Sequence, residues 1–298
     1  MAKKSLGAIV TRHTIEEQKR QRVRILVAED NPMNQKLAVT LLKKAGYSVD
    51  AVEDGRMVME AVKRTVYDLI LMDVQMPEMN GFEATKIIRE MEGEAKHTPI
   101  IAMTTHAMKG DRERCLQAGM DDYISKPIEP QELFDAIEKW TKSQGKEKDL
   151  SPFTLHLSPQ KSEVACSEFI EQREIHGIEL VEPIDLASAL RRFEGDKEFF
   201  KEILQEFLSY VPKQLDKLAE AIKTGEAKVV ETEAHSLKGA AGNLGAQPIA
   251  DLALRLESLG RTKDLAEAKK IIGNLKAELK RLEEYSNRSF KGEIALKS

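Results

Sequence analysis

The sequence lacks a cysteine framework, a long apolar run and an excess of charge of one sign. Its 298 residues include two cysteines, Cys115 and Cys166, which are too few for a disulfide framework and favour a reducing compartment. No apolar stretch approaches the roughly 20 residues that cross a bilayer. The apolar segment near the N-terminus is too short for a signal peptide. We therefore expect a soluble, cytoplasmic chain with no membrane segment of its own.

The charge balance excludes further classes of protein. A net charge of −4 gives no basic surface for nucleic acid or for an anionic membrane. Charged residues make up 32% and hydrophobic residues 41% of the chain, which is typical of soluble globular domains. A length of 298 residues is enough for two domains, each with its own core.

Residues 24–142 alternate short apolar runs with amphipathic stretches. Five runs have the length and apolar character of buried strands, and they lie at residues 24–28, 47–52, 69–72, 100–103 and 123–124. The stretches between them have helical spacing. Apolar strands separated by helices predict an α/β fold, a doubly wound five-stranded parallel sheet that is covered on both faces. In such a sheet, reactive groups gather at the carboxyl ends of the strands.

The second half of the chain has a different pattern. Residues 143–181 are polar, contain prolines and lack periodicity, so they are predicted to be a linker. Residues 182–286 carry helical stripes of apolar residues and no strand signal, which predicts four or five antiparallel helices in an all-α bundle. Their acidic and basic residues nearly balance, which argues against a DNA-binding output domain. Residues 1–23 and 287–298 are predicted to be a lead-in and a C-terminal tail.

Acidic side chains follow two of the predicted strands. Glu29 and Asp30 come after the first strand, and Asp73 comes after the third. Because parallel strands end side by side, these carboxylates should meet and repel one another unless a cation lies between them. Oxygen ligands alone favour Mg²⁺. Such a cation would neutralise an incoming phosphoryl group while one carboxylate attacks the phosphorus.

The fourth and fifth strands also end in polar side chains. Thr104 offers a hydroxyl and Lys126 an ammonium group, and both could hold phosphoryl oxygens. Each residue alone has a more ordinary interpretation. A strand-end aspartate is usually a cap or turn residue, Thr104 could be a capping hydroxyl, and Lys126 could be a solvated surface lysine. The occurrence of all of them at successive strand ends favours the phosphoryl site.

A second reactive side chain lies in the predicted bundle. His235, Lys238 and Gly239 have the spacing of one helical face, so the lysine could attract phosphoryl oxygens beside the imidazole. Each of the glycines at 239 and 242 costs the helix about 1 kcal/mol relative to alanine, which calls for a packing or docking reason. Small residues there leave the surface around His235 open to another domain. The ordinary alternative is a histidine on a closely packed helix.

Two sets of motifs resemble known families. The strings ILVAEDNPMNQ, DLILMDVQMPEMNGFE, PIIAMT and DDYISKP resemble the receiver domain of response regulators, over about residues 24–142. The string HSLKGAAGNLGA resembles the histidine phosphotransfer (HPt) domain, over about residues 181–284. The first resemblance implies a flavodoxin-like sheet, and the second implies a four-helix bundle.

The receiver resemblance also implies the roles of individual residues. It makes Asp73 the phosphoryl acceptor. It makes Asp30 and Asp73 direct Mg²⁺ ligands, Glu29 a ligand through water, and the backbone carbonyl of Gln75 a further ligand. The HPt resemblance makes His235 an exposed histidine that becomes phosphorylated.

The receiver resemblance further implies a phosphoryl-sensing switch. Thr104 and Lys126 would contact the phosphoryl group, and Tyr123 would turn inward when Thr104 moves. The alternative for Tyr123 is an ordinary half-buried strand tyrosine. Thr105 departs from the family, in which the residue after the switch threonine is usually small. A larger side chain there predicts slower hydrolysis of the phosphoaspartate than in Thr105→Ala.

Together these features predict a two-component phosphorelay module. A sensor histidine kinase domain would load Asp73, and the phosphoryl group would then move to or from His235. A downstream response regulator receiver would take the group from the chain. Contact between the receiver and the HPt domain of the same chain is a further possibility. The segment LGAIVTRHTIEEQKRQRVRILVAEDN resembles the region before the last receiver of hybrid sensor histidine kinases, whose longer parent protein could be membrane-anchored.

Other interpretations remain at this point. The chain could be a stand-alone receiver–HPt adaptor or a phosphate sink. A phosphatase with an aspartate nucleophile is a third alternative, but that family needs a second aspartate where Gln75 stands. No glycine-rich nucleotide loop occurs in the sequence, so the chain itself is not expected to draw phosphoryl groups from ATP.

Overall fold

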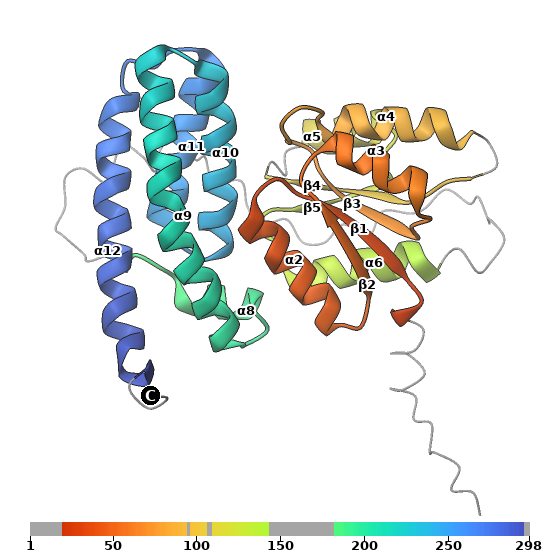
Figure 1. Ribbon diagram of the computed structural model, residues 1–298, viewed down its shortest axis with the longest axis horizontal. Coiled ribbons are helices and arrows are strands. Elements are labelled where there is room, and N and C mark those ends of the chain that lie inside the picture. Colours follow the sequence, from red (N-terminus) through yellow and green to blue (C-terminus); the bar gives the residue numbers. More distant parts are fainter. Residues whose placement is uncertain (1–19, 94–95, 106–108, 143–181, 295–298) are drawn as a thin grey trace, which may run out of the picture.

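The computed structural model describes residues 20–93, 96–105, 109–142 and 182–294. They form two domains, an α/β domain followed by a helical bundle (Figure 1). The predicted linker, most of the predicted lead-in and Cys166 lie outside the described residues. Among the helices that are described, none is both long and apolar enough to cross a membrane.

The α/β domain contains the predicted parallel sheet. Its strands have the order β2–β1–β3–β4–β5, and every neighbouring pair is parallel. The strands are β1 (Arg24–Ala28), β2 (Ser48–Val52), β3 (Leu69–Asp73), β4 (Ile100–Thr104) and β5 (Asp122–Ser125). The strand β3 reads LILMD and is buried along its whole length, as expected for a central strand covered on both faces.

Five helices cover the two faces of this sheet: α2 (Pro32–Lys44), α3 (Gly55–Arg64), α4 (Gly81–Glu92), α5 (Lys109–Gln117) and α6 (Pro130–Lys142). Apolar side chains of α3, α4 and α5 pack on one face of the sheet, and those of α2 and α6 pack on the other. The carboxyl ends of the strands therefore remain at one edge, next to the loops that precede the helices (Figure 1).

Two short turns fix the polar groups at this edge. Asn31 caps α2 by accepting hydrogen bonds from the N–H groups of Met33 and Asn34. Gly81 begins α4 so close to β3 that a Cβ atom there would lie 2.2 Å from the carbonyl oxygen of Asp73. Only glycine fits that approach, and the turn keeps the end of β3 in a defined position.

The bundle consists of four long helices and one short helix. They are α8 (Leu186–Arg192), α9 (Lys197–Thr224), α10 (Ala227–Asn243), α11 (Gln247–Thr262) and α12 (Ala268–Ile294). The last helix continues past residue 286, where the bundle was predicted to end, and Phe290 packs against Phe200 with ring centroids 6.1 Å apart. An aromatic contact one to two turns further along therefore extends the bundle into the predicted tail.

Helix α2 joins the two domains because it has two apolar faces. Ala38 and Leu42 pack on the sheet, whereas Met33, Leu37 and Leu41 belong to the core of the bundle. Figure 1 shows α2 against the bundle, beside α9 and α10. The two domains thus share one continuous apolar contact.

Charged pairs surround this apolar contact. Lys36 of α2 binds Glu202 at 2.8 Å and also Glu206, and Lys44 binds Asp196 at the start of α9. These pairs are partly exposed, so each contributes little to stability. Their arrangement places basic residues of α2 opposite acidic residues of α9, which favours one orientation of the two domains.

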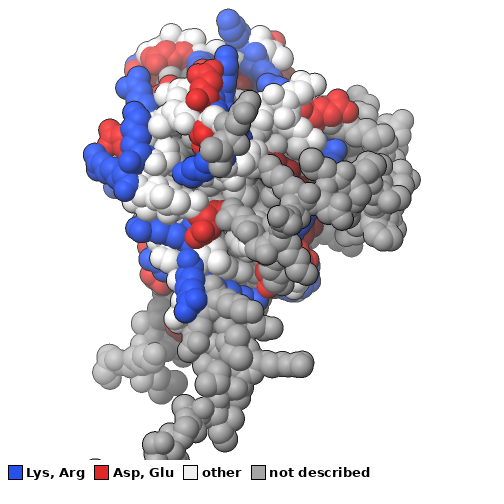
Figure 2. Space-filling view, turned by 90° about the vertical axis from the view of Figure 1, so that its right-hand side faces the viewer, with Lys and Arg blue, Asp and Glu red and all other residues white. Residues whose placement is uncertain are grey.

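The outer face of the α/β domain carries charges of both signs. Figure 2 shows basic and acidic side chains interspersed over the described part of that face. This mixture of charges agrees with the near balance of 46 basic and 50 acidic residues in the sequence.

The packing of Leu37 predicts that the domains can be separated without unfolding either one. Leu37→Asp places a charge in the interdomain contact, so we expect an increased radius of gyration in small-angle X-ray scattering. The unfolding free energy of the α/β domain should change little. As a control, Leu42→Ala removes a side chain from the sheet core and should cost about 2–5 kcal/mol of that domain's stability. An unchanged radius of gyration in Leu37→Asp would contradict the role of this contact.

Candidate functional site

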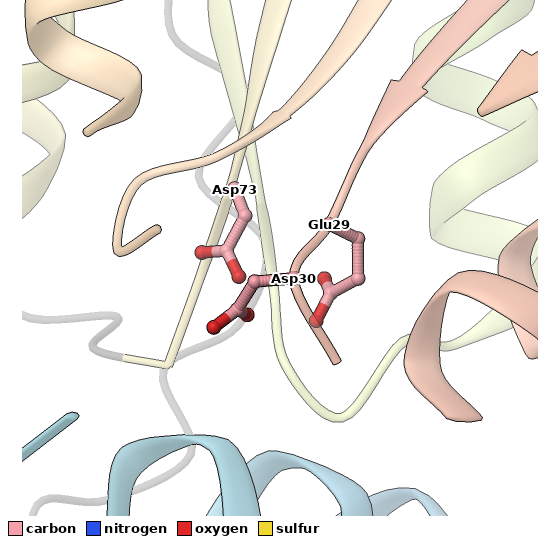
Figure 3. Close-up of side chains that lie close together, drawn as sticks. All are labelled: Glu29, Asp30 and Asp73. Atoms are coloured by element: carbon pink, nitrogen blue, oxygen red, sulfur yellow. The ribbon is translucent and has the colours of Figure 1, made fainter. Parts of the chain in front are cut away.

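Three carboxylates meet at the carboxyl edge of the sheet. Glu29 and Asp30 follow β1, and Asp73 is the last residue of β3. One oxygen of each carboxylate lies within 4.8 Å of the others, and Figure 3 shows the three side chains gathered beyond the strand ends. The sequence prediction that these acids meet is therefore reproduced by the fold.

One lysine reaches into this cluster. Lys126 follows β5, and its Nζ atom lies 2.6 Å from Asp73 Oδ2 and 2.6 Å from Glu29 Oε2. Burial lowers the pKa of the Lys126 ammonium, but the charges of Asp73 and Glu29 outweigh this and raise it above its ordinary value. Lys126 is thus a buried cation inside the site, not the solvated lysine of the alternative interpretation.

The carboxylates carry more negative charge than this lysine can balance. Burial and the charge of Asp73 raise the pKa of Glu29, whereas Lys126 lowers it, and the net result is a pKa of about 7. Burial and the charges of Asp73 and Glu29 raise the pKa of Asp30 to about 8. Three oxygen ligands with one ammonium group between them suit a hard divalent cation, which would favour the ionised form of each acid.

The other predicted site residues of this domain take different positions. Thr104 ends β4 and is mostly buried. The N–H of Gln75 donates to Asp73 Oδ1 at 3.0 Å, and the side-chain Oε1 of Gln75 has no hydrogen-bond partner among the described residues. Tyr123 on β5 is half-buried against the core on the α3–α4–α5 side of the sheet. The fold thus brings Asp73, Thr104 and Lys126 to one edge.

The imidazole of His235 has a fixed orientation in the middle of α10. Its Nδ1 lies 3.1 Å from Oε1 of Glu257 on α11. Burial raises the pKa of Glu257, but hydrogen bonds and charges from His235 and Lys238 lower it to about 2. Because a carboxylate only accepts hydrogen bonds, Nδ1 carries the proton and Nε2 keeps the lone pair. In this tautomer the lone pair of the neutral imidazole lies on Nε2, on the side of the ring away from Glu257.

Glu257 is a candidate site residue that the sequence prediction missed. Its carboxylate also binds Lys238 at 2.5 Å and Arg261 at 2.9 Å, and its side chain is 1% exposed. Lys238 is therefore engaged with a carboxylate instead of standing free beside the imidazole. The signal in the sequence was an acidic residue at a core position of α11, where Ala253, Leu256 and Gly260 are also buried.

The surface around His235 is covered by the α/β domain. The resemblance implied an exposed histidine, but His235 is 6% exposed. Asn31 donates to Oγ of Ser236 at 2.8 Å, and a Cβ atom at residue 239 would lie 3.0 Å from Nδ2 of Asn34. Gly239 therefore permits the close approach of α2 to α10. The sequence analysis expected the small residues of α10 to allow another domain to dock, and the domain that docks there is the chain's own α/β domain.

Asn243, at the end of α10, binds two separate parts of the α/β domain. Its Nδ2 donates to Asn34 Oδ1 at 2.9 Å, and its Oδ1 accepts a hydrogen bond from the N–H of Ile128 at 3.0 Å. Asn34 in turn donates to Glu29 Oε1 at 2.9 Å. These buried amides connect the bundle to the carboxylate cluster and fix the rotation of the two domains.

A cleft of about 580 Å³ lies between the two candidate centres. Its lining includes Gln75 and Thr104 from the carboxylate edge, and Thr232 and His235 from α10. His235 and two residues next to the carboxylate cluster thus line one cleft, whereas Asp73 itself is not among the lining residues. Gln75 and His235, which are far apart in the chain, face the same space.

Comparison with known families identifies both domains. The model of the response regulator receiver domain matches residues 25–138, and the model of the Hpt domain matches residues 202–285. The sensor histidine kinase GacS of Pseudomonas protegens is 34% identical over 267 residues, which cover 86% of this chain and 27% of that protein. The kinase BarA of Escherichia coli K12 is 29% identical over 233 residues, covering 78% and 23%.

Solved structures of receiver domains are similar in sequence to the α/β domain. The receiver domain of a sensor histidine kinase from Pseudomonas aeruginosa, with a magnesium ion in its active-site cleft, is 42% identical and has a TM-score of 0.38. The match covers 40% of this chain and 98% of that one. The chain spans about a quarter of the length of GacS and BarA.

The raised pKa values of Glu29 and Asp30 predict a pH-dependent effect of a divalent cation. Their ordinary pKa values are 4.5 and 3.8, so the folded state holds these protons more tightly than the unfolded state. Without metal, the free energy of unfolding therefore decreases as the pH rises toward 8. Mg²⁺ at a fixed concentration, 100 times its Kd at pH 8.5, should add about 2.7 kcal/mol at that pH. The same concentration should shift the melting temperature less at pH 6, where protons compete with the ion for the carboxylates. Asp30→Asn should weaken this response. Equal shifts at both pH values would contradict the site.

Proposed function

This chain joins a response regulator receiver domain to an Hpt domain, and on that premise we propose that it passes a phosphoryl group between Asp73 and His235. The observation that carries the proposal is the shared cleft, which Thr104 and Gln75 line from one side and His235 lines from the other. A phosphorelay needs an aspartate and a histidine that can approach one phosphorus atom, and this arrangement supports that requirement.

The carboxylate of Asp73 would act as the first acceptor. It attacks the phosphorus of a donor phosphohistidine, the P–N bond breaks, and its electron pair returns to the donor imidazole. The Lys126 ammonium, 2.6 Å from Asp73 Oδ2, would counter the charge of the phosphoryl oxygens, and the hydroxyl of Thr104 would also contact them. Lys126 thus changes partner from a carboxylate to the phosphoryl group.

We propose Mg²⁺ as the cation of the carboxylate cluster. Asp30 and Asp73 would bind it directly, Glu29 would bind through water, and the backbone carbonyl of Gln75 would complete the protein ligands. The ion would supply charge neutralisation of the phosphoryl oxygens. The support is the spacing of the three carboxylates and their surplus negative charge.

Transfer to His235 requires no proton movement. The Nε2 lone pair attacks phosphorus, the P–O bond to Asp73 breaks, and the electron pair returns to the Asp73 carboxylate. The proton stays on Nδ1, where the ionised Glu257 accepts its hydrogen bond and balances the cationic phosphoimidazole. Glu257 is thus a positioning residue that fixes the tautomer and stabilises the charge that develops. The same steps in reverse would return the group to Asp73.

The partners follow from the same chemistry. We propose a histidine kinase domain as the donor to Asp73 and the receiver of a downstream response regulator as the final acceptor from His235. The docked arrangement favours transfer within one chain, since α2 and the bundle share an apolar core. A downstream receiver needs the same face of α10, so it would replace the chain's own receiver after transfer.

Phosphotransfer with a radiolabelled phosphohistidine donor tests the proposed acceptors. Wild type should carry label on both sites, distinguished by the base lability of the acyl phosphate and the acid lability of the phosphohistidine. His235→Gln should keep only the base-labile label, and Asp73→Asn should carry none. Absence of label from the wild type would contradict the relay. Label on His235 in Asp73→Asn would show that the histidine is loaded separately.

The contact between Glu257 and His235 predicts a selective defect in transfer. Glu257→Gln keeps the shape but removes the charge, so the Asp73-to-His235 rate should fall about tenfold or more, the effect of a charged hydrogen bond. Loading of Asp73 should be unchanged. Glu278→Gln, whose carboxylate pairs with Arg281 on α12, is the matched control and should transfer normally. An unchanged transfer rate in Glu257→Gln would contradict the proposed positioning role of Glu257.

A further inference from the structure

A chain of polar contacts crosses the domain interface from Thr105 to His235. Lys238 Nζ donates to Oγ1 of Thr105 at 3.1 Å and to Oε2 of Glu257 at 2.5 Å. The other oxygen of Glu257 lies 3.1 Å from Nδ1 of His235. The residue that departs from the receiver family is therefore the receiver's contribution to a network that ends on the phosphorylatable imidazole.

We propose that Thr105 is a positioning residue for phosphoryl transfer, whose hydroxyl anchors Lys238 across the interface when the two domains dock. The proposal rests on the proposed function, because it assigns Thr105 a part in the Asp73-to-His235 step. It goes beyond that function by separating two properties of one side chain. The bulk of Thr105 would shield the phosphoaspartate, and its hydroxyl would serve transfer.

The position of the Thr105 hydroxyl is set by the sheet. Thr105 directly follows Thr104, whose carbonyl oxygen accepts a hydrogen bond from the N–H of Lys126 at 2.7 Å. The end of β4 is therefore tied to the residue that contacts Asp73. A donor that binds Thr105 is held in a fixed relation to the phosphoryl-accepting carboxylate, and this relation exists only in the docked state.

A second contact would hold the flexible side chain of Lys238 in one conformation. Its flexible four-carbon chain loses rotamer freedom when its ammonium is fixed. Glu257 provides one contact within the bundle, and Thr105 provides a second from the receiver. Burial lowers the pKa of Lys238 while Glu257 opposes that effect, which marks the ammonium as largely removed from water. An ammonium has three donors, so these two contacts leave one for a phosphoryl oxygen.

The transfer step itself is balanced without any further reactant. The P–O bond to Asp73 breaks with its electron pair returning to the carboxylate, the bond from phosphorus to His235 Nε2 forms, and the Nδ1 proton stays in place. Thr105 takes no part in bond making. Its effect is on how Lys238 and Glu257 are held while negative charge moves from the receiver to the bundle.

Three substitutions at residue 105 separate the two properties. Thr105→Ser keeps the hydroxyl and reduces the bulk, Thr105→Val keeps the bulk and removes the hydroxyl, and Thr105→Ala removes both. Full-length chains are loaded at Asp73 with phosphoramidate and Mg²⁺, and rapid quenching gives the rate constant for the appearance of phosphohistidine, normalised to loaded Asp73. Hydrolysis of the acyl phosphate is measured separately in the His235→Gln background.

The two rates are expected to depend on different properties of residue 105, transfer on the hydroxyl and hydrolysis on the bulk. Transfer should fall about tenfold in Thr105→Val and Thr105→Ala and remain near wild type in Thr105→Ser, the effect of one hydrogen bond to a charged group. Hydrolysis should be near wild type in Thr105→Val and faster in Thr105→Ser and Thr105→Ala. In combination with Lys238→Met, Thr105→Val should cause little additional loss, because both changes remove the same contact.

The outcomes distinguish this inference from the proposed function. Wild-type transfer together with equally fast transfer in Thr105→Val would overturn the role of Thr105 and leave the relay intact. Fully additive losses in the double variant with Lys238→Met would also overturn it. A loaded wild-type chain that never labels His235 would overturn the proposed function as well.

Discussion

The arrangement of both reactive centres depends on helix α2, which packs against two hydrophobic cores at once. Ala38 and Leu42 fix it to the sheet, and Met33, Leu37 and Leu41 fix it to the bundle. Apolar packing is strong but carries little directional information. The direction comes from the polar start of α2, where Asn31 contacts Ser236 beside His235 and Asn34 contacts Asn243 at the end of α10. Packing brings the domains together, and buried amides set their register.

The two centres differ in their balance of charge: acidic groups are in excess around Asp73, and basic groups are in excess around His235. At the Asp73 centre three carboxylates lie close together, and two of them, Asp73 and Glu29, contact the single lysine, so negative charge is in excess. Around His235, one buried carboxylate holds the imidazole together with Lys238 and Arg261. In the proposed transfer, a phosphoryl group that leaves Asp73 would move toward a centre with basic side chains already in position. Glu257 would balance the charge of the cationic phosphoimidazole.

Much of the fold and of the first centre could be predicted from the sequence, because both depend on local patterns. The run LILMD places Asp73 at the end of a buried strand, and parallel topology brings Glu29, Asp30, Thr104 and Lys126 to the same edge. The second centre was only partly predictable. Glu257 lies 22 residues from His235 on another helix, and its side chain meets the imidazole only through the packing of α10 on α11. The burial of His235 depends on a second domain, which no pattern within α10 encodes.

The central claim is that one chain holds its aspartate and its histidine in a single docked site. The concentration dependence of transfer from phosphorylated Asp73 to His235 tests this claim most directly, because transfer within a chain is a first-order process. We predict a rate constant that stays the same over a wide range of chain concentration. We also predict that phosphorylated His235→Gln mixed with Asp73→Asn will transfer more slowly than the intact chain. A rate constant that rises in proportion to chain concentration would contradict the account.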